Sequence, residues 1–225
     1  MAIMRWCLDP HVLSAMEFEK FAKLVGGKNG KGSQNRLRSI WEKARDSIGC
    51  RVGEGAAYEA QVMVEGLKQI RAVIAETERK IESLCMEFPE YSCLLTIPGF
   101  GPDVSAKVLA AIGDPFRFEN GKQVLKLAGW DLNAERSGQS SASACPVISK
   151  KGKAPLRYAL YQAAFIASTK NREFVIYFTN KLRGREKEPG IKTKMRVKLA
   201  AKLLIIAWTL MKKKEVFRPD YLKIE

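Results

Sequence analysis

The sequence is poor in the residues that most hydrolases and metalloenzymes use. It has one histidine, His11, and five cysteines, at positions 7, 50, 85, 93 and 145, with no C-x-x-C pair. A single histidine argues against a Ser-His-Asp triad and against a multi-histidine metal site. An odd number of widely spaced cysteines argues against a disulfide framework and a zinc ribbon. Any chemistry in this chain would therefore proceed without an imidazole base, and we predict no metal site.

Long apolar runs are also missing. The longest uncharged apolar stretch in the C-terminal part, Leu203–Met211, has nine residues, whereas a membrane-spanning helix needs about 20. The N-terminus has no sustained apolar region followed by a small-residue cleavage site, so it does not resemble an export signal. We therefore expect a cytoplasmic protein with no membrane partner.

Acidic residues are scarce relative to basic ones. The 225 residues include 39 Lys and Arg but only 24 Asp and Glu, for a net charge of +15. Residues 150–225 hold 20 basic and six acidic side chains, whereas residues 1–149 hold 19 and 18. Such a concentrated positive charge favours a polyanionic partner such as nucleic acid.

Hydrophobic residues make up 46% of the sequence, and their spacing is mostly helical. Ser14 and Glu17 have the spacing of a capping box, which predicts a helix up to Val25. Ser33 has the position of an N-cap for a second helix, which we expect to end at Gly49. The fold class predicted is mainly α.

A heptad repeat of apolar residues begins at Ala56 and continues to Phe88. Its members step by four and three residues: Ala56, Ala60, Met63, Leu67, Ile70, Ile74, Thr77, Ile81, Leu84 and Phe88. A strict heptad keeps these side chains on one side of a long helix, which needs a partner helix to cover it. The repeat predicts either a coiled coil between two copies of the chain or an intramolecular hairpin with the second helix.

The segment LLTIPGFGPDVSAKVLAAIG, residues 94–113, predicts two short helices joined by a tight turn. It resembles the helix-hairpin-helix motif of DNA-binding proteins. Gly99 and Gly101 would let the backbone approach a phosphate, and the following helix would offer its N-terminal N–H groups. Such contacts bind the DNA backbone rather than the bases. A plain helical hairpin with a glycine turn is the alternative.

Three further patterns follow this hairpin. Asn120 and Gln123 have capping-box spacing before a short helix that ends at Gly129. Residues 130–149 are rich in small polar residues, and we predict a loop there. Lys150, Lys151 and Lys153 precede a helix opened by Pro155, which predicts an anion-binding helix start. A charged connector and a long apolar helix around Val197–Leu210 then complete the chain.

Four motifs in this order, IPGFG, LKLAGW, ERSGQSS and ISKKGKAPLRYALYQAA, resemble the C-terminal domain of the insertion sequence 110 family of transposases. The resemblance extends from Leu94 to about Lys170, and the heptad resembles the middle region of the same family. It implies DNA as a partner, and its better-studied members are also guided by an RNA. The family's nucleophile is a serine in a Ser-Gly motif, and Ser137 with Gly138 matches it.

The family also has an N-terminal RNase H-like domain with metal-binding carboxylates, and no segment of this chain resembles it. The chain is therefore expected to be a C-terminal part, inactive by itself, with magnesium present only when the metal-binding domain is supplied. The predicted parts are residues 1–55, a coiled coil at 56–90 that makes a homo-oligomer, and a transposase domain at 91–225. Besides Ser137, the predicted DNA contacts are Gly99, Gly101, Arg136, Lys150, Lys151, Lys153 and Arg157.

Two other functions stay open from the residues. The first is a non-catalytic DNA- or RNA-binding module that uses the hairpin and the basic C-terminal part. The second is a membrane-surface protein, which is the weaker hypothesis because the Val197–Leu210 helix is apolar nearly all round, as suits a core.

Overall fold

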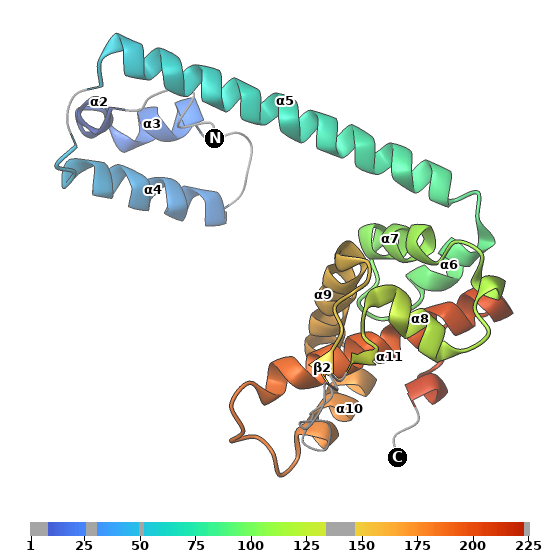
Figure 1. Cartoon of the computed structure of the whole chain (residues 1–225). Helices are drawn as coiled ribbons and strands as arrows, with labels where there is room; N and C mark the ends of the chain where they lie inside the picture. Colours follow the sequence, from blue (N-terminus) through green and yellow to red (C-terminus); the bar gives the residue numbers. More distant parts are fainter. Residues whose placement is uncertain (1–8, 26–30, 50–51, 134–146, 223–225) are drawn as a thin grey trace, which may run out of the picture. The chain divides into compact units, whose positions relative to one another are not determined.

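The computed structural model describes residues 9–25, 31–49, 52–133 and 147–222. Within these ranges the structure has ten α-helices, two short 3₁₀ helices and one two-stranded ladder (Figure 1). The prediction of a mainly α fold is confirmed. None of the helices in these ranges is long and apolar enough to cross a bilayer. The chain divides into two compact units, residues 1–77 and residues 78–225.

The first unit begins with three short helices, α2 (Pro10–Ser14), α3 (Phe18–Val25) and α4 (Lys31–Arg45). They pack around three buried side chains, those of Leu13, Phe21 and Leu37. The Trp41 indole N–H donates a hydrogen bond to the Met16 carbonyl at 2.8 Å, which ties α4 to the turn between α2 and α3.

The predicted capping box at Ser14 is wrong. Ser14 is the last residue of α2, and its hydroxyl donates to the His11 carbonyl. Asp9 is the N-cap in its place, because its carboxylate accepts from the His11 N–H at 2.8 Å and Pro10 occupies the first turn. The Asp-Pro pair thus starts a helix before Ser14, and a separate helix follows.

Helix α5 spans Glu54–Cys85 and confirms the long helix predicted from the heptad. It runs from the first unit into the second. Most of its heptad side chains are exposed, including Met63 at 64%, Ile70 at 59% and Ile74 at 50%, while the last heptad residue, Phe88, lies beyond its end. In the described residues α4 packs on α2 and α3. The intramolecular hairpin between α4 and α5 is therefore not the arrangement found.

The second unit holds the remaining elements: α6 (Pro89–Leu95), α7 (Pro102–Ile112), η1 (Pro115–Arg117), α8 (Gly121–Ala128), β1 (Leu132–Asn133), β2 (Val147–Ile148), α9 (Ala154–Lys170), α10 (Arg172–Leu182), α11 (Ile191–Lys213) and η3 (Pro219–Leu222). Helix α11 is the centre of the core and packs against α6, α8, α9 and α10 (Figure 1). Its buried face explains its apolar sequence: Leu199, Leu203, Leu204 and Leu210 are each at most 1% exposed.

Two elements of this unit differ from the sequence prediction. The predicted loop at 130–149 contains a short antiparallel ladder at its base, with Leu132 paired to Ile148 and Asn133 to Val147. Helix α10, capped by the Asn171 side chain on the Phe174 N–H, was not predicted. Two-residue strands give little periodic signal in the sequence. Helix α10, by contrast, has a local signal, since Asn171 caps it and the buried Phe174, Phe178 and Leu182 recur at four-residue spacing.

Candidate nucleic-acid interface

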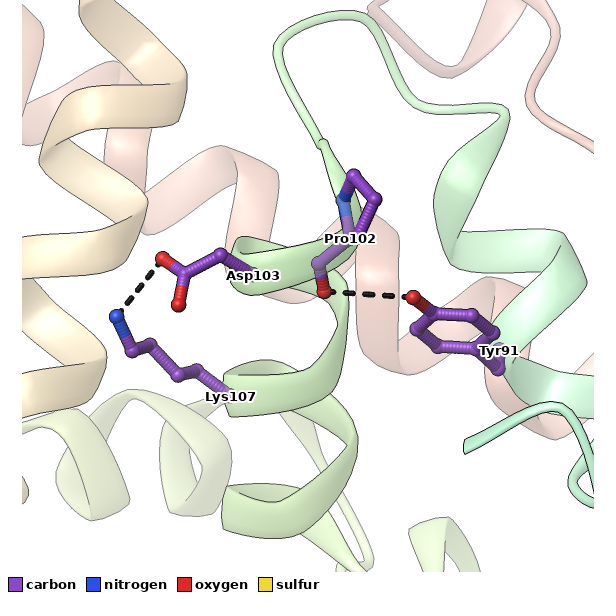
Figure 2. A network of polar contacts seen from close by, with 4 residues as sticks. All are labelled: Tyr91, Pro102, Asp103 and Lys107. Atoms are coloured by element: carbon purple, nitrogen blue, oxygen red, sulfur yellow. Dashed lines mark hydrogen bonds and ion pairs between the residues drawn. The ribbon is translucent and has the colours of Figure 1, made fainter. Parts of the chain in front are cut away.

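Helices α6 and α7 form a helical hairpin as predicted, with Pro102 at the first helical position of α7, but its first helix begins at Pro89 rather than at Leu94. Tyr91 of α6 is fully buried and its hydroxyl points at the Pro102 carbonyl, 3.5 Å away (Figure 2). Burial raises the pKa of the Tyr91 phenol, so it remains a protonated donor at neutral pH. This contact joins the two helices across the turn and holds the N-terminus of α7 in position.

The two predicted phosphate-binding glycines have different surroundings. Gly99 has a φ of 90°, and a Cβ there would overlap the Ala163 carbonyl oxygen of α9. The fold itself therefore requires glycine at this position. Gly101 is extended, with a φ of −98°, and a Cβ there would meet nothing within 4 Å. Packing among the described residues gives no reason for glycine at position 101.

The N-terminus of α7 is exposed and has no side-chain cap. Asp103 lies in its first turn, where a negative charge would oppose a phosphate. Its carboxylate forms an ion pair with Lys107 one turn later, with an N–O distance of 2.8 Å (Figure 2). Lys107 thus offsets the negative charge that Asp103 brings to the helix start.

The base of the predicted serine loop is built on two glycines. A Cβ on Gly129 would lie 2.7 Å from the Gly152 nitrogen, and one on Gly152 would lie 2.6 Å from the Leu127 oxygen. The two backbones thus lie too close for any side chain. Lys150 N–H donates to the Gly129 carbonyl and Lys153 N–H to the Leu127 carbonyl, each at 2.9 Å. The end of α8 and the start of α9 are joined by these contacts.

Hydrogen bonds between Ser149 and Asp131 lie next to this base. The Ser149 hydroxyl donates to the Asp131 carboxylate at 2.5 Å, and the Ser149 N–H donates to the Asp131 carbonyl at 2.9 Å. Together with the β1–β2 pairs, these bonds hold residues 131–133 and 147–149 side by side. Ser137 and Arg136 belong to the segment between these ends and lie outside the described residues. The structure therefore positions the ends of the segment that carries them.

The four predicted basic residues that the structure describes divide into two pairs. Lys153 and Arg157 bind carbonyl oxygens within the fold: Lys153 Nζ donates to Ala111 at 3.1 Å, and one Arg157 nitrogen donates to Ala128 and Gly152 at 2.9 and 3.0 Å. Lys150 and Lys151 are exposed. Lys150 also has a φ of 55°, a conformation that fits the close approach of the two glycines. Lys150 and Lys151 are available to a phosphate, whereas Lys153, which is also exposed, and Arg157 are engaged with carbonyls that support the base.

The C-terminal cations divide in the same way. Lys202 Nζ donates to the Leu222 carbonyl, and Lys212 Nζ donates to the Phe118 carbonyl at 3.1 Å. Lys192, Lys194 and Lys198, near the start of α11, are exposed. Part of the positive charge of this region therefore supports the fold through hydrogen bonds to backbone carbonyls. The sequence alone does not show which lysines do so.

Other chemically reactive groups lie apart from these residues. Burial raises the pKa of the Cys85 and Cys93 thiols, which disfavours the nucleophilic thiolate. Cys85 also lines an apolar cavity of about 620 Å³ with Phe88 and Leu109, and none of the predicted site residues lines it. In the part of the chain that the structure describes, no three His, Cys, Asp or Glu side chains gather as metal ligands.

Comparison with known proteins gives one family. Residues 91–178 match the model described as the transposase IS116/IS110/IS902 family. The matched range runs from α6 into α10 and includes every predicted site residue, from Gly99 to Arg157. It confirms the resemblance drawn from the four sequence motifs. No curated protein is similar enough to the chain to register as a match.

Proposed function

We propose that this chain is the DNA-binding, serine-bearing part of a transposase. The premise is that residues 91–178 belong to the IS110/IS116/IS902 transposase family. The family implies DNA transposition, and hence DNA as a partner. The main support for assigning the serine is the position of Ser137-Gly138 in the sequence. The pair lies inside the matched range and between β1 and β2, whose pairing brings the two ends of this segment together. A guide RNA stays a prediction from the resemblance.

In the proposed reaction the Ser137 hydroxyl oxygen attacks a DNA phosphorus. A Ser–O–P bond forms, a P–O bond of the DNA backbone breaks, and the released DNA oxygen takes up a proton. A serine hydroxyl is a weak nucleophile at neutral pH and must lose its own proton to a base. Negative charge that develops on the phosphate is offset by nearby cations, for which Arg136, Lys150 and Lys151 are the candidates.

The structure suggests a supporting role for the other predicted cations. Because Lys153 and Arg157 bind carbonyls of α7, α8 and the glycine base, we assign them to positioning Lys150 and Lys151. Magnesium enters this proposal only with a carboxylate site supplied by another domain or chain. The described residues offer no cluster of ligands that fits it, and no step above is routed through it.

The α6–α7 hairpin is proposed to bind the DNA backbone through the N-terminus of α7. Its support is the exposed, uncapped helix start and a glycine at 101 that packing does not require. A phosphate at this position would meet backbone N–H groups and the positive end of the helix dipole.

We expect Gly101→Val to weaken duplex binding about tenfold while the helical circular dichroism is unchanged. The branched side chain fits the open space in the protein but would separate a phosphate from α7. The measurement is anisotropy of a labelled duplex at several salt concentrations, where the parent should show a steep log–log slope. Gly53→Val makes the same neutral change at the open, exposed start of α5 and is the control. Equal affinities of parent and Gly101→Val would make the hairpin purely structural.

The second part of the proposal is that the chain self-associates through α5. It keeps the predicted parts, a coiled coil at 56–90 and a transposase domain at 91–225. Its support is the exposed apolar row on α5, which no helix of the first unit covers in the described residues. A row of this length would be covered by the same row of a second copy.

The expected result of Ile74→Lys is a shift from dimer to monomer in sedimentation velocity, because a lysine within the row would be desolvated in the interface. Gln69→Lys adds the same side chain to the exposed outer face of α5 and should remain dimeric. A parent protein that sediments as a monomer at all concentrations would remove this part of the proposal.

The alternative function is a non-catalytic DNA- or RNA-binding module, a remnant of a transposase. It uses the same hairpin and cations but has no need of Ser137. A covalent protein–DNA adduct separates the two functions.

A further inference from the structure

We propose that the solvent-facing side of α9 binds unpaired nucleotides by stacking their bases on its aromatic rings. The proposal rests on the nucleic-acid binding proposed above and adds a second surface with a different ligand. Neither the hairpin nor the serine segment includes this surface.

Helix α9 buries a face rich in alanine and leaves a face of aromatic rings in solvent. The buried side chains are Leu156, Ala159, Leu160, Ala163, Ala164 and Ala167, each at most 2% exposed. At about 100° per residue, Tyr158, Tyr161 and Phe165 project from the opposite side. Tyr158 is 66% exposed and Phe165 is 44% exposed. We call these three residues the aromatic stripe.

This stripe occupies a position where soluble helices normally carry charges. Helix α9 has no acidic residue, and its only charged residues are Arg157 and Lys170. Large exposed rings in a row cost solubility and mark surfaces that bind something. The core does not require them, because the alanine face already packs against α11, α10 and α7.

Positive charge lies against the stripe at Arg196 and at both ends of α9, and it favours an anionic partner. The Arg196 guanidinium lies 4.5 Å from the centre of the Phe165 ring, and its Nε is buried with no hydrogen-bond partner in the described residues. Exposed Lys150 and Lys151 precede α9, and exposed Lys170 ends it. A protein partner would need acidic groups to match these cations, whereas a nucleic-acid strand supplies both phosphates and ring faces.

The ligand must be unpaired because stacking on a side chain needs a free base face. In a duplex the base faces are covered by neighbouring pairs, whereas single strands can expose theirs. Tyr158 and Phe165 are two helical turns apart, about 10 Å, or about three rises of 3.4 Å along a stacked strand. The stripe therefore has room for a few nucleotides. DNA and RNA share this chemistry.

The test measures anisotropy of labelled oligo(dT) and oligo(U) of about 15 nucleotides, with a duplex of equal length, on the full chain. Tyr158→Ala and Phe165→Ala should each weaken single-strand binding about tenfold, and the double variant more, with duplex binding unchanged. Tyr158→Phe and Phe165→Tyr keep the rings and should bind like the parent. Ile166→Ala, which removes an exposed apolar side chain of the same helix, is the matched control.

Cross-linking gives a positive readout that does not depend on variants. An oligonucleotide with 5-iodouracil should, after irradiation, attach to Tyr158 or Phe165, as located by mass spectrometry. Binding of oligo(dT) alone, oligo(U) alone or both supports the proposal and shows whether the stripe takes DNA, RNA or either.

Four outcomes would overturn it. The double variant could bind single strands like the parent, or lose self-association in sedimentation instead, which would make the stripe a protein interface. A parent that binds duplex but no single strand would end this proposal and leave the proposed function in place. A parent that binds neither would end both.

Discussion

Ser137→Ala should abolish the covalent protein–DNA adduct that the parent chain forms when a matching carboxylate domain, magnesium and DNA substrate are supplied. The adduct is the phosphoserine bond itself, so it survives a denaturing gel. Alanine has no oxygen to attack phosphorus, and we expect no neighbouring group to replace it. Loss of one hydroxyl from a small polar segment should change the free energy of unfolding by no more than about 0.5 kcal/mol. Circular dichroism and duplex affinity should therefore match the parent.

The neighbouring serines are the internal controls. Ser140, Ser141 and Ser143 share the composition of the segment but not the match to the Ser-Gly motif, so their alanine variants should keep the adduct. An adduct that persists in Ser137→Ala and vanishes in Ser141→Ala would move the nucleophile to Ser141. No adduct from the parent in any reconstitution would favour the non-catalytic binding module.

Gly152→Ala should destabilise the second unit by about 3 kcal/mol or more. The added Cβ would lie within 2.6 Å of the Leu127 oxygen, and the atoms it meets are backbone atoms that cannot rotate away. Relief requires separating α8 from the start of α9, which breaks the Lys153-to-Leu127 hydrogen bond and moves the ends of the serine segment. For a unit of this size the loss corresponds to a fall of about 10 °C in melting temperature.

Gly101→Ala is the matched control for this prediction, since it makes the same chemical change where a Cβ meets nothing within 4 Å. Its melting temperature should stay within a few degrees of the parent value, because an N-cap change costs about 1 kcal/mol or less. Thermal denaturation followed by circular dichroism measures both variants. Equal melting temperatures for Gly152→Ala and the parent would contradict the close approach of Gly129 and Gly152.

The sequence by itself was sufficient for α5, α7, α8 and α9, whose signals are local. The heptad predicted α5, Pro102 and Pro155 marked the starts of α7 and α9, and the Asn120 cap and Gly129 end of α8 are both present. These features depend on residues within one or two helical turns, so they can be read along the chain. The order of the four motifs also identified the family over the range that the comparison confirms.

Only the tertiary structure decided which of the candidate residues face a ligand and which hold the fold together. Gly99 and Gly101 look alike in sequence, but Gly99 packs against Ala163 whereas Gly101 is open. Lys153 looks like its neighbours Lys150 and Lys151, yet its ammonium binds the Ala111 carbonyl, 42 residues away. The reason is physical: a side chain's partner is set by which backbone lies beside it after packing, and that neighbour is distant in sequence. The aromatic stripe of α9 follows the same rule, because periodicity places Tyr158 and Phe165 on one face but only packing shows that it faces solvent.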